Sequence, residues 1–221
     1  MAEIKIIVFD YDRVLTDYNL NFDYRLESYF EDLKKRNILV GINTGRRWEY
    51  IKSMAQKVNF IIYENGYFYF EKFKVPLFND EDREIALFIK EKIKNSNMEC
   101  IEGEMITSCP IEYFEKLRNI FTDKKIKLVK NIDRVMVLPI NIDKGKALQK
   151  VLNFKNLNGE HLCVIGDGEN DIDMFYFAGL PGSINNSVDS LKRISKIFSP
   201  QSYSDGTLDI LEKLKNMNYK Y

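Results

Sequence analysis

One apolar run near the N-terminus constrains the fold of this chain more than any other feature. Residues 4–9 read IKIIVF, and the carboxylates Asp10 and Asp12 follow directly. A short run of this kind is typical of a strand that is buried on both faces, as in the middle of a parallel sheet. Ligands bind at the carboxyl ends of strands in open α/β sheets, so this D-x-D pattern stands where chemistry is expected. Taken alone, the pair is equally compatible with two solvated turn residues.

Strand-like and helix-like segments alternate after this run, which predicts parallel strands with helical crossovers. Helical spacing of apolar residues indicates helices at residues 23–36 and 47–58, with strands at 38–42 and 59–63. Asn65-Gly66 is a strong hairpin signal, and residues 67–70 are expected to pair back as its second arm.

The pattern changes near residue 76, and a different unit is expected there. A charged helix is predicted at 80–95, an extended segment at 98–109, a helix at 110–122 and strands at 125–129 and 135–138. None of these strands ends in the acidic residues that mark the other strand ends. The sequence therefore predicts a core made of residues 1–76 and 140–221, with a small α/β domain at 77–139 inserted between its two parts.

Chemistry-bearing residues return after the insert. Lys144 opens a helix to about residue 152, and a strand at 162–165 ends in GDGENDIDMF, which contains Asp167 and Asp171. The tail predicts a helix at 188–194, a strand at 196–199 and a last helix at 207–215.

These polar groups are expected at one rim of the sheet, because parallel strands end on the same side. They are Asp10 and Asp12, Thr44 and Gly45, Asp167 and Asp171, and Lys144 at a helix start. Clustered carboxylates repel one another unless a cation lies among them. Oxygen ligands without sulfur or histidine favour Mg²⁺ over zinc, and Mg²⁺ commonly shares phosphate oxygens with its protein ligands. A phosphorylated substrate is therefore expected.

Composition excludes several other classes of function. Lys and Arg balance Asp and Glu to a formal net charge of zero, which argues against binding to nucleic acids or membrane surfaces by bulk electrostatics. No segment approaches the roughly 18 apolar residues of a membrane span, and no secretory signal is expected. His161 is the single histidine, so Ser-His-Asp hydrolysis is disfavoured. Cys100, Cys109 and Cys163 form no C-x-x-C pair, which favours reduced thiols in a cytoplasmic protein.

The four motifs together resemble those of the haloacid dehalogenase-like (HAD) hydrolases. They are DYDRVLTD, the Thr44-Gly45 strand end, Lys144-Gly145 and GDGxND, and they occur in the family's order. The α/β insert between the second and third motifs is similar to subfamily IIB, the Cof-type branch. That branch includes archaeal phosphoglycolate phosphatases, sucrose-phosphate phosphatases and phosphomannomutases. The resemblance covers about residues 1–72 and 141–215, and over the insert it is one of position and size only.

The resemblance implies a Rossmann-like parallel-sheet core with a C2-type cap, and a role for each matching residue. Asp10 would be the nucleophile that forms an aspartyl-phosphate, and Asp12 the general acid and then the general base. Thr44 would hydrogen-bond a phosphoryl oxygen, and Lys144 would neutralise charge on Asp10 and the phosphoryl group. The phosphate-binding residues would be Gly45, Arg46, Lys144 and Asn170. Mg²⁺ would be held by Asp10, Asp12 (through its backbone carbonyl) and Asp167, with Asp171 as a further, direct or indirect, ligand.

Some of these residues have a plainer interpretation as well. Thr44 could cap the following helix, and Lys144 could be a solvated residue. For Arg46 and Arg47, a position on a solvated face and a contact with substrate are equally compatible with the sequence. Lys146 and Glu169 are expected to be solvated.

Two positions next to the nucleophile bear on the reaction class. Arg13 stands where the family usually has glycine, which places a long cation beside the active-site loop. An aspartate at position 12 favours phosphatase or phosphomutase over the ATPase branch, which has a threonine there.

The sequence therefore predicts a Mg²⁺-dependent phosphatase for a small phosphorylated metabolite, of the phosphoglycolate or sugar phosphate type. A phosphomutase of the same fold is the alternative. A more distant one is a receiver-type signalling module, which also uses an acceptor aspartate with a threonine and a lysine. We expect a cytoplasmic monomer or homodimer without nucleic-acid or membrane partners.

Overall fold

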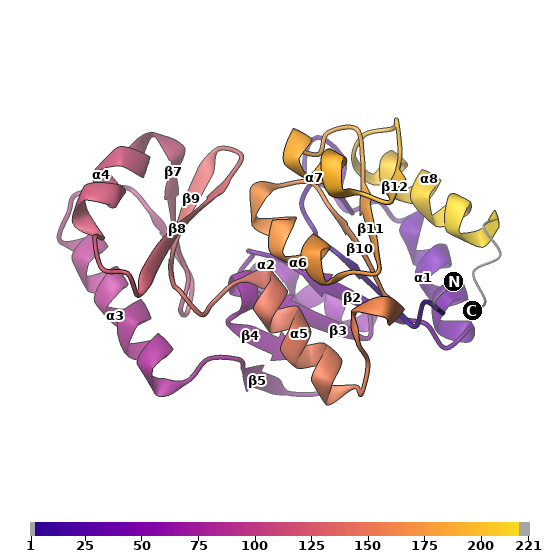
Figure 1. The fold of residues 1–221 in the computed structure, drawn as a ribbon, viewed down its shortest axis with the longest axis horizontal. Coiled ribbons are helices and arrows are strands. Elements are labelled where there is room, and N and C mark those ends of the chain that lie inside the picture. Colours follow the sequence, from indigo (N-terminus) through magenta and orange to yellow (C-terminus); the bar gives the residue numbers. More distant parts are fainter. Residues whose placement is uncertain (1–2, 217–221) are drawn as a thin grey trace.

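The computed structural model of the chain describes residues 3–216, so the ends of the predicted core, 1–2 and 217–221, lie outside it. Figure 1 shows two lobes side by side, each built around its own sheet. The large lobe contains both the N-terminal and the C-terminal parts of the chain. The small lobe contains the segment between them.

The large lobe is built on a sheet of eight strands in the order β12-β11-β10-β1-β2-β3-β4-β5. The strands are β1 (Ile6–Phe9), β2 (Leu39–Asn43), β3 (Phe60–Tyr63), β4 (Phe68–Phe70), β5 (Lys74–Pro76), β10 (Leu162–Gly166), β11 (Leu180–Ser183) and β12 (Ile197–Phe198). Neighbouring strands from β12 to β3 are parallel, and β4 and β5 continue as an antiparallel arm. The predicted parallel sheet and the β3–β4 hairpin are confirmed.

Strand β1 is buried on both faces, as its sequence predicts. Its residues alternate between two hydrophobic clusters, because successive side chains of a strand point to opposite faces. Ile7 and Phe9 pack with α1 (Leu26–Lys35) and α8 (Tyr203–Asn216). On the opposite face, Ile6 and Val8 pack with α5 (Lys144–Phe154), α6 (Ile172–Phe177) and α7 (Asp189–Ile194). Helices therefore cover both faces of the sheet.

The small lobe is an antiparallel sheet with helices on one face. Its strands are β6 (Ile101–Glu102), β7 (Thr107–Pro110), β8 (Ile126–Asn131) and β9 (Arg134–Pro139), in the order β6-β7-β9-β8, and its helices are α3 (Asp80–Lys94) and α4 (Phe114–Ile120). Val135 and Val137 of β9 pack with these helices. The alternate residues Met136 and Leu138 join the core of the large lobe instead. Strand β9 thus packs against the small-lobe helices with one face and against the core of the large lobe with the other.

Several elements differ from the sequence-based expectation. The helix expected at 47–58 is a short α2 (Trp48–Ile51) followed by a 3₁₀ helix at Lys52–Gln56. The extended segment expected at 98–109 is two strands, β6 and β7, joined by a turn. Strands β5 and β11 and helix α6 were not predicted. The bounds 77–139 of an inserted domain stay a prediction.

The expectation of reduced cysteines is wrong for two of the three. Cys100 and Cys109 form a disulfide, while Cys163 is free and buried in β10. The pairing follows from strand register, because Ile101 lies opposite Ser108 and the two cysteines are the next pair, with Cα atoms 4.3 Å apart. The cysteines therefore no longer support a reducing compartment.

No helix among residues 3–216 is both long enough and apolar enough to cross a membrane.

Candidate active site

The acid-bearing strand ends meet at one edge of the large sheet. Strand β1 lies between β10 and β2, and Phe9 is in register with Ile165 on one side and Ile42 on the other. Asp10 follows β1 directly, Asp167 follows β10, and Thr44 follows β2. The predicted clustering at one rim is therefore confirmed.

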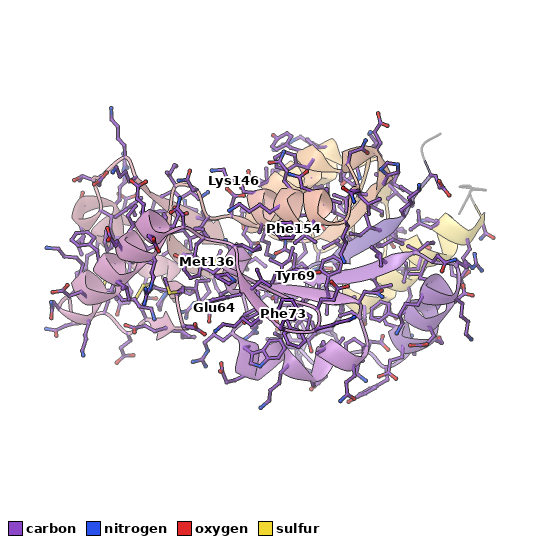
Figure 2. All side chains as sticks on the ribbon, turned by 90° about the horizontal axis from the view of Figure 1, so that it is seen from below. Glu64, Tyr69, Phe73, Met136, Lys146 and Phe154 are labelled. Atoms are coloured by element: carbon purple, nitrogen blue, oxygen red, sulfur yellow. A yellow bond between two sulfur atoms is a disulfide. The ribbon has the colours of Figure 1, made fainter. Side chains whose placement is uncertain are left out.

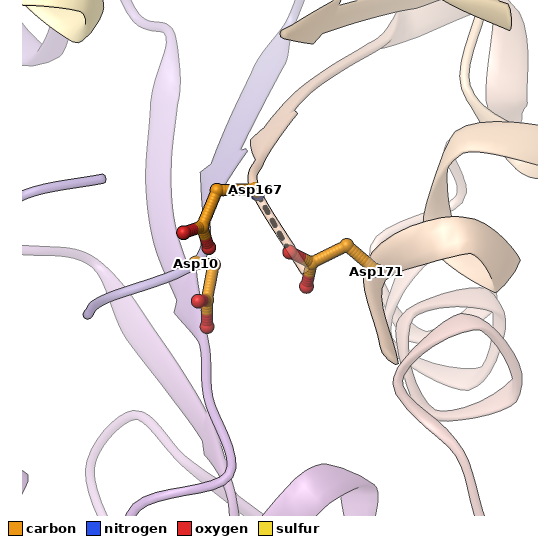
Figure 3. Close-up of side chains that lie close together, drawn as sticks. All are labelled: Asp10, Asp167 and Asp171. Carbon is orange, nitrogen blue, oxygen red and sulfur yellow. Dashed lines mark hydrogen bonds between the residues drawn. The ribbon is translucent and has the colours of Figure 1, made fainter. Parts of the chain in front are cut away.

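Three aspartates form the centre of this rim, as Figure 3 shows. Each of Asp10, Asp167 and Asp171 offers a carboxylate oxygen, and these oxygens lie within 4.8 Å of one another. The Asp171 carboxylate also accepts hydrogen bonds from the backbone N–H groups of Asp167 (2.9 Å) and Gly168 (3.1 Å). Gly166 leaves room for it, because a Cβ at that position would lie 2.6 Å from an Asp171 oxygen.

Lys144 is buried beside these carboxylates. Its Nζ lies 2.6 Å from Asp10 Oδ1 and 2.7 Å from Asp171 Oδ1, and the side chain is fully buried. Asn43 holds the lysine's backbone by donating to its carbonyl oxygen at 2.9 Å. Asp143 caps helix α5 by accepting from the Lys146 N–H. The interpretation of Lys144 as a solvated residue is therefore wrong.

Burial and charge shift the protonation of this cluster. Burial, opposed by Lys144 and reinforced by the nearby Asp171 and Asp12, raises the pKa of Asp10 to about 7. Burial, followed by Asp10 and Asp171, raises the pKa of Asp167 well above its usual range. Burial disfavours the charged form of Lys144, but the attraction of Asp10 and Asp171 outweighs it and raises the pKa of the ammonium group. More carboxylate charge is gathered here than one lysine balances.

The donor set fits a hard divalent cation. All candidate ligand atoms are oxygens at one buried rim, and a cation would relieve the repulsion that opposes ionisation of Asp10 and Asp167. The Asp12 carboxylate is not part of this cluster.

Asp12 is held by an arginine at the side of the rim. Arg46 forms a bidentate pair with it, with Nε and Nη2 at 2.7 and 2.8 Å from the two carboxylate oxygens. The guanidinium also lies over the Tyr50 ring, 4.1 Å from its centroid. The structure thus places Arg46 in the site rather than on a solvated face.

The loop after β2 is close-packed. Thr44 is buried, and its hydroxyl accepts from the Arg46 N–H at 3.1 Å. Helix α2 has Arg47 at its N-cap and no side-chain capping bond, so Thr44 does not cap it. Asn170, on the loop after β10, donates to Asn65 at 3.2 Å, and both side chains are buried.

A cavity of about 350 Å³ opens above the rim, between the two lobes. The large lobe contributes Asp10, Asp12, Arg13, Leu20, Gly45, Arg46, Arg47, Tyr50, Asp167 and Asn170. The small lobe contributes Ile101, Ile106, Ser108, Asn131, Ile132, Asp133, Arg134 and Met136. Arg47 also donates to the Glu102 carbonyl at 3.2 Å. The sequence identified the first group in large part and none of the second.

The sequence analysis did not identify the contacts that two further residues make at the site. Asn186 donates to the Asp167 carboxylate and to the Arg13 carbonyl, both at 3.2 Å, but it follows the unpredicted strand β11. Glu169 was expected to be solvated, yet it accepts from the Ile132 N–H of the small lobe at 3.0 Å. Lys146 agrees better with its expectation, because its ammonium is partly exposed and bonds the Ile140 carbonyl.

The fold is of the α/β class, with an acidic rim at the carboxyl ends of its parallel strands. The chain matches the family model described as haloacid dehalogenase-like hydrolase over residues 7–104 and 104–211, and it belongs to that family. Membership excludes the receiver-module alternative.

Relatives that align with nearly the whole chain indicate which kind of hydrolase it is. The chain is 27% identical to a phosphoglycolate phosphatase of Sulfurisphaera tokodaii, over 96% of this chain and 94% of the relative. A phosphoglycolate phosphatase of Archaeoglobus fulgidus is 28% identical, with 97% and 98% covered. The chain is a phosphatase of the HAD family.

Solved structures share its fold. A Thermoplasma acidophilum protein aligns with a TM-score of 0.80 at 18% identity, covering 97% of this chain and 100% of that one. A sugar phosphatase of HAD subclass IIB aligns with a TM-score of 0.77 at 13% identity, covering 96% and 99%.

Proposed function

We propose that this phosphatase hydrolyses a small phosphate ester in a Mg²⁺-dependent reaction, with Asp10 as the nucleophile. The observation that supports this most strongly is the buried Asp10–Lys144–Asp171 cluster beneath a cavity lined with arginines. A buried carboxylate held 2.6 Å from a cation at a strand end is oriented for attack on an entering phosphoryl group.

The proposed reaction gives each of these side chains one role. A carboxylate oxygen of Asp10 attacks phosphorus, and the bond between phosphorus and the leaving oxygen breaks. Asp12 gives a proton to that oxygen and later accepts one from the water that hydrolyses the aspartyl-phosphate. Lys144 keeps Asp10 in place and offsets negative charge as it develops.

Arg46 and the metal complete this proposal. We infer that Arg46 exchanges its bond with Asp12 for a phosphoryl oxygen when the substrate enters, which frees Asp12 to carry the proton. Thr44, Gly45 and Asn170 would surround the phosphoryl group. Mg²⁺, held by Asp10, Asp167 and the Asp12 carbonyl with Asp171 nearby, would supply charge neutralisation at the phosphoryl oxygens.

Two arginines that line the cavity, Arg134 and Arg47, favour a substrate with an acidic leaving group over one with a neutral sugar. Arg134 donates to the hydroxyl and the carbonyl of Ser108, and Arg47 to a carbonyl, so these bonds leave both guanidinium charges unbalanced. A single carboxylate from the small lobe, Asp133, lines the cavity with them. A substrate with a carboxylate beyond its phosphate, such as phosphoglycolate, would pair with Arg134 or Arg47. The activity named for the archaeal relatives agrees with this choice.

The test is phosphate release from phosphoglycolate, several sugar phosphates and p-nitrophenyl phosphate, with and without Mg²⁺. We expect release that requires Mg²⁺ and that Asp10→Asn abolishes. Full activity of that variant, or in a chelator, would refute the mechanism. Activity that depends on added hexose bisphosphate would point to the phosphomutase instead.

Arg134→Ala tests the choice of substrate. Loss of a charge-assisted hydrogen bond should raise KM for phosphoglycolate by about ten- to a hundredfold and leave p-nitrophenyl phosphate nearly unchanged. Arg118→Ala is the matched control, because Arg118 lies on the same lobe and is exposed. Equal effects on both esters would contradict an acidic subsite.

We further propose that residues 77–139 act as a cap that excludes bulk water from the cavity and limits entry to small esters. A cytoplasmic location, a monomeric or dimeric state and the lack of nucleic-acid and membrane partners stay predictions from the sequence.

A further inference from the structure

Glu64 is a buried carboxylate at the junction of the two lobes. It is not among the residues to which we assigned a catalytic, phosphate-binding or metal-binding role. It follows β3, is 2% exposed, and points toward the small lobe (Figure 2). Its Oε1 accepts from the Glu104 N–H at 2.8 Å. Its Oε2 accepts from Met105 at 2.7 Å and Ile106 at 2.9 Å. Three successive N–H groups of the turn between β6 and β7 thus converge on one side chain.

The backbone of the same residue is bonded to the loop after β2. The Glu64 N–H donates to the Arg46 carbonyl at 3.0 Å, and the Asn65 N–H donates to the Thr44 carbonyl at 2.9 Å. Residues 64–66 all have positive φ, which is uncommon for non-glycine residues and persists only where surrounding contacts hold it. Gly66 is required there, because a Cβ would lie 2.5 Å from the Asp143 carbonyl oxygen.

The turn held by Glu64 belongs to a hairpin that forms one wall of the cavity. Ile101, Ile106 and Ser108 line the cavity from this hairpin. Ser108 in turn bonds Arg134, which we assigned to the leaving group. A shift of the turn would therefore move Arg134 relative to Asp10.

We propose that Glu64 is a positioning residue that sets the distance between the phosphoryl-binding loop at 44–46 and the leaving-group wall of the cavity. This inference rests on the proposed function. The chain itself joins the lobes through the short segments 77–79 and 140–143, which lie between β5 and α3 and between β9 and α5. Glu64 adds a directional side-chain link between the lobes, across 40 to 42 residues of sequence.

Directionality distinguishes this link from the apolar contacts between the lobes. Apolar contacts tolerate sliding, because the hydrophobic effect is non-directional. A carboxylate that accepts three convergent N–H groups fixes the turn in position, and none of the three donors is a cation that could follow it by changing rotamer.

Two variants test the link, one in Glu64 itself and one in the hairpin that Glu64 binds. Glu64→Gln keeps the shape but replaces one acceptor oxygen with an NH₂ donor, which must face at least one backbone N–H. Gly103→Ala leaves Glu64 intact but adds a Cβ that would lie 2.5 Å from its Oε1 and so displaces the carboxylate. Glu102→Gln is the matched control, because it removes a carboxylate from an exposed position of the same hairpin.

The measurement is kcat/KM for phosphoglycolate divided by kcat/KM for p-nitrophenyl phosphate, beside circular dichroism and thermal unfolding. Misplacement of the wall should lower this ratio about tenfold in both variants, through KM for phosphoglycolate, while Glu102→Gln stays within about twofold. The ratio does not depend on the fraction of folded enzyme, so a loss of stability alone does not change it.

An unchanged ratio with a lower unfolding temperature would overturn the proposal and leave Glu64 as a structural clamp only. An unchanged ratio with unchanged stability would overturn it as well. Failure of the proposed function appears in the wild type, as absent or Asp10-independent hydrolysis. Failure of the positioning role appears only in the variants.

Discussion

At the scale of single residues, the site depends on one buried cation among acidic side chains. Lys144 contacts Asp10 and Asp171 at 2.6 and 2.7 Å, and all three are buried. Removing one partner of a buried ion pair leaves an uncompensated charge, which costs more than the pair itself contributes. We therefore expect the lysine to contribute to stability as well as to the proposed chemistry.

Lys144→Met should lower the free energy of unfolding by roughly 3–5 kcal/mol and abolish hydrolysis, since two carboxylates lose their buried partner. Urea unfolding in a chelator measures the first effect, and phosphate release measures the second. Lys146→Met, two residues along the same helix and partly exposed, should stay within about 0.5 kcal/mol of wild type. Equal stability of the two variants would contradict the assigned role of the buried cluster.

The sequence located Asp10, Lys144 and Asp167 because each stands at a strand end or helix start that local pattern identifies. It could not reveal that Asp12 pairs with Arg46, or that Glu64 binds three N–H groups of the other lobe. Both contacts join segments more than 30 residues apart, and residue type alone does not specify such partners.

At the scale of elements, the strands that the sequence did not predict were missed for different reasons. Strand β11 contains Pro181 and Gly182, which are both depleted in strands, yet it pairs with β10 and β12. Tertiary pairing overrides the weak propensity there. The β6–β7 hairpin escaped for another reason, because β6 has only two residues and shows no alternation.

The Cys100–Cys109 disulfide should stabilise this hairpin. Its closed loop of about ten residues predicts a gain of about 2–3 kcal/mol through the lower entropy of the unfolded chain. Urea unfolding with and without dithiothreitol measures this gain. The Cys100→Ser/Cys109→Ser double variant should have the same stability with and without the reductant, close to that of the reduced wild type. A wild type whose stability does not respond to the reductant would contradict the expectation.

At the scale of the whole molecule, the two lobes share one cavity. The carboxylate rim and the phosphoryl-binding loop lie on the large lobe, while Arg134 and Ser108 come from the small lobe. Under the proposed function, the large lobe would carry out the chemistry and the small lobe would contribute to the choice of substrate.

Binding of Mg²⁺ should stabilise the folded protein, since its ligands come together only on folding. At a concentration 100 times the dissociation constant, the gain is about 2.7 kcal/mol. Thermal unfolding with increasing Mg²⁺ measures it, and Ca²⁺ serves as a comparison. Asp167→Asn should reduce the gain, whereas Asp173→Asn, on helix α6, should keep it. A gain that is the same in both variants would place the cation elsewhere.

The sequence alone determined the parallel sheet buried on both faces, the acidic rim and the family, because these depend on local periodicity and on residues beside the strands that position them. Only the tertiary structure decided the disulfide, the Arg46–Asp12 pair, the Glu64 link and the wall that carries Arg134. Each of these depends on strand register or on the placement of one lobe against the other. That placement arises from many weak contacts summed over distant segments, and no local pattern encodes it.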